Sequence, residues 1–410
     1  GIKNLLVPGI IFEEMGFRYF GPIDGHNISL LIKTLKNVLT IKEPIFIHVL
    51  TKKGKGCSFA ENSPERFHSC PPFNPETGEV KPKPITKKDI AISQLETFTD
   101  TFGKKMIELA EKNPKIVAIS AAMPEGTGLS EFSKRFPERF FDTGIAEEHA
   151  VTFASGLARG GFKPVVAVYS TFLQRSYDQL IHDIALQNQA VVFALDRAGL
   201  VGEDGPTHHG LFDISYMRSI PNMIVSAPKN ERELEKMLEL AINYNGPFSI
   251  RYPRGSSESY KFNLKECPDV QLGKSELLIR GKDIAIFAFG NMAYTALEIA
   301  ESLKIAGISP SVINARFAKP LDEELIEEMA NITKRIITLE DGIVNGGFGS
   351  AVLEFIAREG LEAKVKIFGF PNKFIEHGKK EEIFKKYNLT QEAIAQIILK
   401  EMFHKESKIV

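Results

Sequence analysis

The sequence predicts an α/β protein in which helices cover mostly parallel sheets. Apolar runs of strand length alternate with helical patterns over most of its 410 residues. Apolar residues make up 43% of the chain, which is enough for substantial cores. Polar clusters follow several predicted strands, and α/β sheets bind ligands beyond the carboxyl ends of their strands. The length predicts two to three domains.

Residues 1–85 are expected to form part of a domain and a linker. A short strand is predicted at 17–21, a helix at 28–39, and a buried strand at 44–51, where the apolar run is nearly continuous. One helix and two strands cannot close a core, so this piece needs partners outside its own stretch. Prolines make residues 71–88 linker-like.

Residues 86–268 are predicted to form a doubly wound α/β domain, because strands and helices alternate throughout. Strands are expected at 115–120, 163–169, 190–196, 223–227 and 248–252. Helices are expected at 98–111, from Glu147 onward, at 172–187 and at 231–244.

Residues 269–410 repeat this alternation on a smaller scale. Strands are expected at 284–289, 311–315, 335–340 and 365–368, and helices near 293–305, 321–330, 346–358 and 390–402. Few polar residues cluster here, so we expect a structural or interface-forming domain.

Composition and charge argue against several classes of protein. The net charge is −1 and no basic block stands out, which disfavours nucleic-acid binding. The three cysteines form no Cys-x-x-Cys pair, so a reduced cytoplasmic protein is expected, and the irregular spacing of Cys57, His68 and Cys70 argues against a metal site. The apolar N-terminus is broken by Pro8, too short for a membrane span, and without a signal-peptide pattern. Because it begins without Met, we expect a further segment before it.

Residues 142–158 are the stretch around which we expect the chemistry to be organised. A strand end and a glycine turn lead into a helix that begins with Glu147 and Glu148 and continues with small apolar residues. Acidic side chains in a first turn complement the helix dipole, which is a sufficient explanation for their presence. That explanation does not account for two acidic residues at the N-terminus of a helix that is otherwise almost uncharged. We therefore take Glu147 as the candidate catalytic residue.

The loop at 196–210 is the most informative polar segment, because it is rich in glycine and carries Arg197, His208 and His209. Arginine can bind a phosphate or carboxylate in a bidentate way, and histidine can transfer protons near neutral pH. A structured surface loop remains the alternative. Arg251 and Arg254, at the end of the last strand predicted for this domain, add positive charge at the same rim and together with Arg197 favour an anionic substrate.

Six motifs together resemble those of the 1-deoxy-D-xylulose-5-phosphate synthase family. Members of this family are thiamine-diphosphate enzymes of the transketolase superfamily. The six motifs are Gly-Pro-Ile-Asp-Gly-His at 21–26, Thr-Lys-Lys-Gly-Lys-Gly at 51–56, Ile-Ala-Glu-Glu-His-Ala-Val-Thr at 145–152, Tyr-Ser-Thr-Phe-Leu-Gln-Arg at 169–175, Asp-Arg-Ala-Gly at 196–199 leading to Thr-His at 207–208, and Arg-Tyr-Pro-Arg-Gly at 251–255. The resemblance runs in order from about residue 5 to about residue 395. It implies a transketolase-like fold, with a partial N-terminal α/β domain, a pyrimidine-binding domain and a smaller C-terminal domain.

The resemblance implies a carboligation that produces a precursor of isoprenoids, thiamine and pyridoxal. Pyruvate is decarboxylated on the cofactor and the two-carbon unit is transferred to D-glyceraldehyde 3-phosphate, giving 1-deoxy-D-xylulose 5-phosphate and CO2. Glu147 matches the glutamate that hydrogen-bonds the aminopyrimidine ring, and a low-dielectric site would favour its protonated form. The other matched positions divide into cofactor contacts (Phe172, Lys53, Ile145), acceptor-pocket residues (Tyr169, Arg197, Asp204, Arg254, Arg175) and proton-transfer histidines (His208, His68).

Each matched residue also has an ordinary structural explanation. Phe172 could simply pack in the core, and Arg175 could pair with Asp178 three residues further along a helix. After His68 the sequence departs from the family, since Ser69 and Cys70 stand where Gly or Ala and then Pro are expected.

The largest departure concerns the diphosphate half of the cofactor site. The family binds Mg²⁺, and through it the diphosphate, with a Gly-Asp-Gly motif and a downstream Asn. No Gly-Asp-Gly occurs in this chain. We therefore expect the metal and diphosphate site to come from a segment outside this sequence, either a part of the same protein or a separate chain. We also expect a homodimer, as in the family.

Two alternative functions stay open at the level of sequence. One is a β-type subunit of a 2-oxoacid dehydrogenase, which shares the last two domains. Residues 1–70 and the arginine pattern speak against it. The other is a non-catalytic interaction module that lost its first domain. The joint presence of Glu147, Phe172, Arg197, His208 and Arg254 speaks against that reading.

Overall fold

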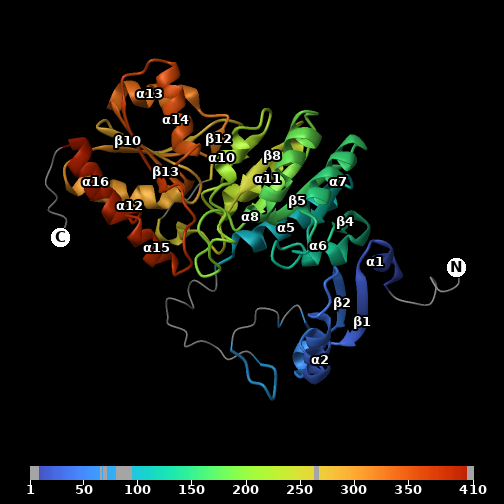
Figure 1. The fold of residues 1–410 in the computed structure, drawn as a ribbon. Helices are drawn as coiled ribbons and strands as arrows, with labels where there is room; N and C mark the ends of the chain where they lie inside the picture. Colours follow the sequence, from blue (N-terminus) through green and yellow to red (C-terminus); the bar gives the residue numbers. More distant parts are fainter. Residues whose placement is uncertain (1–8, 65–66, 68–71, 80–94, 263–266, 404–410) are drawn as a thin grey trace. The chain divides into compact units, whose positions relative to one another are not determined.

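The computed structural model describes residues 9–64, 67, 72–79, 95–262 and 267–403. The chain divides into two compact units, Gly1–Ala91 and Ile92–Val410, which are described separately (Figure 1). None of the helices in the described part of the chain is both long and apolar enough to cross a membrane.

The first unit holds two parallel strands, β1 (Arg18–Asp24) and β2 (Ile45–Leu50), joined by helix α2 (Ile28–Val38). The short helices α1 (Ile10–Glu14) and α3 (Ser58–Asn62) flank them. The strands and the helix between them confirm the sequence prediction. Among the described residues of this unit only two hydrophobic side chains are buried, and most apolar side chains of α2 are exposed. The described part of this unit therefore shows one layer and not the second that a closed core requires.

A seven-stranded sheet forms the first half of the second unit, in the order β12-β7-β8-β6-β5-β3-β4. All pairs are parallel except the one between β12 and β7. The strands are β3 (Ile116–Ser120), β4 (Phe140–Asp142), β5 (Lys163–Tyr169), β6 (Val192–Asp196), β7 (Ile224–Ser226), β8 (Phe248–Arg251) and β12 (Phe317–Lys319). Five of these strands lie where the apolar runs predict them.

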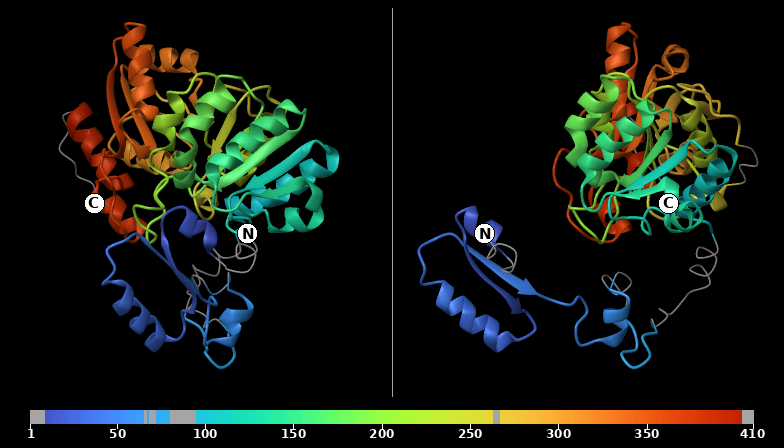
Figure 2. Two further views of the ribbon diagram at one scale, coloured as in Figure 1. Left: turned by 45° about the vertical axis from the view of Figure 1, so that its right-hand side comes forward. Right: turned by 90° about the vertical axis from the view of Figure 1, so that its right-hand side faces the viewer.

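Helices cover both faces of this sheet, as expected for a doubly wound fold (Figure 2). One face packs against α5 (Phe98–Lys112), α6 (Ser130–Arg135) and α11 (Glu231–Asn243). The other packs against α7 (Glu147–Arg159), the helical segment that begins with α8 (Ser170–Leu173), and α10 (Asp213–Arg218).

The second half of this unit is a five-stranded sheet in the order β14-β13-β10-β11-β9. Its strands are β9 (Glu276–Ile279), β10 (Ile284–Ala288), β11 (Pro310–Asn314), β13 (Arg335–Ile343) and β14 (Lys364–Phe370). On one face lie α12 (Met292–Ile305) and α16 (Gln391–Phe403), and on the other lie α13 (Glu323–Thr333) and α14 (Phe348–Arg358) (Figure 1). Helix α15 (Lys380–Lys386) precedes α16.

Alternate residues of β10 separate two cores. Ile284 and Ile286 point into the core beneath α12 and α16. Ala285 and Phe287 belong to a cluster that continues into the seven-stranded sheet's own core, beneath α7 and α10. This shared cluster explains why the two sheets form one compact unit.

Three features differ from the sequence prediction. The helix predicted at 172–187 is interrupted: α8 is followed by a 3₁₀ turn at 174–176, a single turn at 177–179 and a π-helix at Leu180–Ala185. The hydroxyls of Thr152 and Ser155 on α7 donate to the Asp183 carboxylate (2.5 Å) and carbonyl (2.7 Å), and such tertiary bonds are invisible to a periodicity argument. The sequence analysis also missed the antiparallel strands β9 and β12, which are only four and three residues long.

Candidate active site

The carboxyl ends of four parallel strands bring the polar loops of the sequence to one edge of the seven-stranded sheet. β4 leads into α7, β5 leads into α8, β6 leads into the loop at 197–210, and β8 leads into residues 252–255. Parallel strands end at the same edge, so these four connections are neighbours.

Glu147 is the first residue of α7 and its side chain is only 3% exposed. Among the described residues its Oε2 atom has no hydrogen-bond partner, and Nη1 of the Arg175 guanidinium lies 4.0 Å from it. A buried carboxylate oxygen without a partner costs about 1–3 kcal/mol, so such an atom calls for an explanation. Glu148, by contrast, is half-buried and lies 4.0 Å from the same arginine.

The turn before α7 is held by Asp142 at the end of β4. Its Oδ1 atom accepts the backbone N–H groups of Ala122 (2.8 Å) and Gly144 (2.9 Å). Gly144 has a positive φ of 69°, which costs glycine little and lets the chain turn sharply into the helix. The Asp142 carboxylate thus links the loop after β3 to the turn that precedes Glu147.

An aromatic cluster lies beside the start of α8. The Phe172 ring stacks on Tyr169, with centroids 5.7 Å apart, and meets the His208 ring edge to face at 5.4 Å. The Thr171 hydroxyl donates to the Thr207 carbonyl at 3.2 Å, which joins this helix to the loop that carries His208. Burial raises the pKa of Tyr169, so its hydroxyl stays protonated.

Arg197 is held on several sides. Its guanidinium lies over the Tyr169 ring, 4.3 Å from the centroid, and Nη1 contacts the Asp196 carboxylate at 2.8 Å. The same nitrogen donates to the Gly126 carbonyl. Gly126 must lack a side chain, because a Cβ there would collide with the Tyr169 hydroxyl. No protein partner is found in the described part of the chain for Nε or Nη2, which leaves that edge of the guanidinium open to a ligand.

The carboxylate of Asp196 orients the Arg197 side chain through the contact with Nη1. The carboxylate is fully buried at the end of β6 and also accepts the Thr99 hydroxyl (2.7 Å) and the Arg197 N–H (2.7 Å). Burial raises the pKa of Asp196, while Arg197 and these hydrogen bonds oppose the increase. The sequence analysis gave Asp196 no role; its position directly before Arg197, at the end of a buried strand, was the available signal.

The two adjacent histidines have different surroundings. The Val201 N–H donates to His209 Nδ1 (3.3 Å), so the proton resides on Nε2, which donates to the Glu376 carbonyl (3.1 Å). His209 is buried, and burial lowers its pKa. His208 is half-buried, and its Nδ1 lies 2.9 Å from the Thr207 hydroxyl. The ring of His209 therefore anchors the loop, and that of His208 remains accessible for proton transfer.

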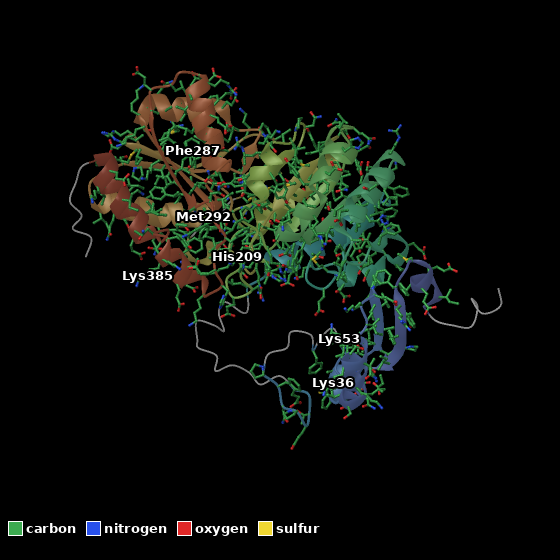
Figure 3. The ribbon with its side chains drawn as sticks, in the orientation of Figure 1. Lys36, Lys53, His209, Phe287, Met292 and Lys385 are labelled. Atoms are coloured by element: carbon green, nitrogen blue, oxygen red, sulfur yellow. The ribbon has the colours of Figure 1, made fainter. Side chains whose placement is uncertain are left out.

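The C-terminal half of the unit supports the loop at 197–210. Asp341 accepts the Leu200 N–H at 2.9 Å, and a Cβ at Gly199 would collide with its carboxylate. Figure 3 labels His209, whose bond to Glu376 ties the loop to the C-terminal half of this unit. Near the end of β8, Arg254 Nη1 donates to Asp204 Oδ2 at 2.9 Å, and both side chains are about half exposed. The C-terminal half thus shapes the rim of the site, which its sparse polar clusters did not indicate.

The remaining predicted site residues are more dispersed. Arg175 lies near Glu147 and Glu148, and no ion pair with Asp178 is found in the described part of the chain. Ile145 is 79% exposed, so its side chain is open to a ligand or partner. Lys53 is exposed in the first unit, and His68 lies outside the described residues.

Three domain families match the sequence in order. Residues 1–51 match 1-deoxy-D-xylulose-5-phosphate synthase, residues 96–258 match the pyrimidine binding domain of transketolase, and residues 273–394 match the transketolase C-terminal domain. A 1-deoxy-D-xylulose-5-phosphate synthase from Caldanaerobacter subterraneus is 53% identical over 97% of this chain, and one from Aquifex aeolicus is 52% identical over 97%. This chain belongs to the 1-deoxy-D-xylulose-5-phosphate synthase family of transketolases.

The chain spans about 62% of the length of these two family members. Solved structures agree with the fold. A chain described as "Split gene transketolase, inactive beta4 tetramer" is 31% identical, with a TM-score of 0.68 over 75% of this chain and 98% of its own. The transketolase from Campylobacter jejuni is 20% identical, with a TM-score of 0.63 over 97% of this chain and 70% of its own, which shows likeness of fold alone.

Proposed function

We propose that this chain carries the pyrimidine half of a thiamine-diphosphate site in a synthase. The reaction is the decarboxylation of pyruvate and the joining of the remaining two-carbon unit to D-glyceraldehyde 3-phosphate, giving 1-deoxy-D-xylulose 5-phosphate and CO2. Family membership supports the reaction class, and ~50% identity to curated synthases supports the choice of substrates. By the same argument the protein acts in the cytoplasm, as a homodimer.

The observation that carries the proposal is the buried, unpartnered Oε2 atom of Glu147. A carboxyl in such a position can share a proton with a ring nitrogen, and that bond would remove the cost of the unsatisfied oxygen. The residues around it fit an aromatic cofactor, because the stacked rings of Tyr169 and Phe172 offer an apolar surface near the carboxyl ends of the strands. Thiamine diphosphate, when bound, supplies the electron sink that decarboxylation beside a carbonyl requires.

The chain's own residues would divide the remaining tasks. Glu147 would hold the aminopyrimidine ring, with Phe172 against it and Ile145 at its edge. Arg197 and Arg254 would bind the phosphate of the acceptor, since guanidinium groups match phosphate oxygens in a bidentate way. His208 would move a proton to or from the acceptor, and Tyr169, Asp204 and Arg175 would line the pocket. Lys53 and His68 are proposed to join them from the first unit.

We propose that the Mg²⁺ and diphosphate site comes from a segment outside this sequence. The Gly-Asp-Gly motif of the family does not occur in the chain. A split-gene transketolase chain of similar fold is described as an inactive β4 tetramer. We expect the present chain alone to be inactive as well, because it does not contain the Gly-Asp-Gly motif.

Glu147→Gln tests the proposed function. In the protein supplied with its diphosphate-binding segment, we expect kcat for CO2 release from pyruvate to fall by about 10²–10⁴-fold, the range for a lost acid–base group. The melting temperature should stay unchanged, because the amide is isosteric with the carboxyl. Glu148→Gln is the matched control and should retain near-normal turnover. Near-normal turnover of Glu147→Gln would exclude the assigned role.

A further inference from the structure

Two adjoining cavities lie at the rim of the candidate active site, where the end of β8 faces the C-terminal half of the unit. Their volumes are about 470 and 410 Å³, within the range of small-molecule sites. Arg254, Lys380 and Glu381 line both of them. Arg254 was expected to bind substrate, whereas no role was expected for Lys380, the first residue of α15.

The backbone of the loop at 197–210 fixes the position of Lys380. Gly202 has a φ of 92° and its carbonyl accepts the Gly378 N–H at 3.3 Å. A Cβ at Gly202 would lie only 3.3 Å from Lys380 Cγ, so the aliphatic stem of the lysine lies directly against this glycine. The loop that carries Arg197 and His208 therefore also packs against Lys380.

The amine of Lys380 lacks a counter-ion. Among the described residues, none accepts a hydrogen bond from it and no carboxylate lies within 4.0 Å, although its side chain is half-buried. Several carboxylates line the cavities, but none of them lies within 4.0 Å of the Lys380 amine. Glu203, Glu381 and Glu392 are exposed to solvent, Glu298 is paired with Lys261, and Asp341 accepts the Leu200 N–H.

The electrostatic surroundings of Lys380 disfavour its charge. Burial lowers its pKa and the positive charge of Arg254 adds to this effect, whereas the carboxylates of Asp341 and Glu381 oppose it. Arg254 and Lys380, which come from separate halves of the unit, thus line the same cavities, and of these two cations only Arg254 has an ion pair among the described residues. An anion between them would relieve the repulsion and restore the hydrogen bonds that burial removes from the amine.

We propose that Lys380 is a further phosphate-binding residue of this site, which acts with Arg254 to select a phosphorylated acceptor. This inference rests on the proposed function and extends it to the C-terminal half of the chain. The ligand class is a small phosphomonoester. Arg254 provides a planar, bidentate contact, and Lys380 provides a compact charge whose stem is fixed by packing on Gly202.

The test compares Lys380→Met with Lys385→Met. Methionine keeps the length and packing of the stem and removes the charge. Lys385 is an exposed lysine of the same helix and is not among the residues that line the two cavities, which makes it a matched control (Figure 3). In the protein supplied with its diphosphate-binding segment, the KM for D-glyceraldehyde 3-phosphate should rise about 10–100-fold for Lys380→Met, the range for a lost hydrogen bond to a charged group. The KM for pyruvate and the kcat with unphosphorylated D-glyceraldehyde should stay within about threefold of the parent.

A binding measurement separates this inference from the proposed function. Both cavities lie within the second unit, so this chain can be titrated directly with glycerol 3-phosphate and with inorganic phosphate by calorimetry at low salt. Lys380→Met should weaken binding of glycerol 3-phosphate about tenfold or more relative to Lys385→Met. If Lys380→Met weakens binding of glycerol 3-phosphate but the parent protein with its diphosphate-binding segment shows no synthase activity, the proposed function is overturned and the phosphate site is retained. Full activity with equal binding by both variants, or equal KM increases for phosphorylated and unphosphorylated acceptors, would overturn the role of Lys380 alone.

Discussion

At the scale of single residues, the candidate site depends on side chains that hold other side chains. Asp196 and Thr99 lie 97 positions apart in the chain, and their hydrogen bond of 2.7 Å is part of the support for Arg197. The motif that contains Arg197 could be predicted from the sequence. The role of Asp196 could not, because an aspartate at the end of a strand has no distinctive pattern until its burial and its partners are known.

Asp196→Asn should misplace Arg197 without unfolding the protein. The amide keeps the size of the side chain but loses the charged contact, which contributes about 1.5–3 kcal/mol. We expect the KM for the phosphorylated acceptor to rise about tenfold or more while kcat changes less than threefold, as measured by steady-state kinetics of the protein with its diphosphate-binding segment. Asp178→Asn, on the exposed surface of the interrupted helix, is the control. An equal loss of kcat would instead assign Asp196 a direct part in the chemistry.

At the scale of secondary-structure elements, apolar runs predicted most central strands because buried parallel strands are apolar on both faces. The short strands β9 and β12 could not be predicted in this way, because their pairing depends on partners that lie far away in the sequence. The interrupted helix after β5 shows the same limit. Its apolar spacing is helical, whereas the π-helical turn contains Asp183, whose side chain and carbonyl accept hydrogen bonds from α7.

Helix α14 depends on a buried carboxyl at its N-terminus. Glu340 on β13 accepts the N–H groups of Phe348 (2.7 Å) and Gly349 (2.9 Å). Burial raises its pKa from 4.5 to about 7, although these hydrogen bonds and Arg251 and Arg218 act in the opposite direction. The folded protein therefore retains a proton between pH 4.5 and 7 that the unfolded chain has released.

We expect the stability contributed by Glu340 to be fully present below pH 4.5 and to decrease as the pH rises to about 7. A raised folded-state pKa for an acid has this sign, and its magnitude here is about 3 kcal/mol. Urea unfolding of the parent and of Glu340→Gln at several pH values would measure it. The variant should lack this component of the pH dependence, whereas Glu362→Gln, at an exposed position, should retain it. Parallel pH profiles of the parent and Glu340→Gln would contradict the prediction.

At the scale of the whole second unit, a buried charge network joins its two halves. Glu233 on α11 and Glu276 on β9 are bridged by Lys229 and Arg316, with distances from 2.5 to 3.3 Å, and Asn314 donates to both carboxylates. The charges balance as two acids and two bases. The fold class and the order of the strands could be predicted from the sequence, but this network could not, because its members are spread over almost 90 positions.

Arg316→Met should destabilise the protein by about 3–5 kcal/mol, because it leaves a buried carboxylate without its counter-charge. Arg280→Met removes an exposed ion pair with Glu328 and should cost less than about 1 kcal/mol. Urea denaturation of the two variants gives the comparison. Equal losses would show that the buried network adds nothing beyond an exposed pair.

The pairing of β12 with β7 has a practical consequence for dividing this protein. β12 follows β9, β10 and β11 in the chain, yet it covers the outer edge of the seven-stranded sheet. A fragment that ends between β8 and β9 would leave β7 with a row of open N–H and C=O groups, and exposed strand edges of this kind template aggregation. A soluble pyrimidine-binding fragment would therefore have to extend past Lys319.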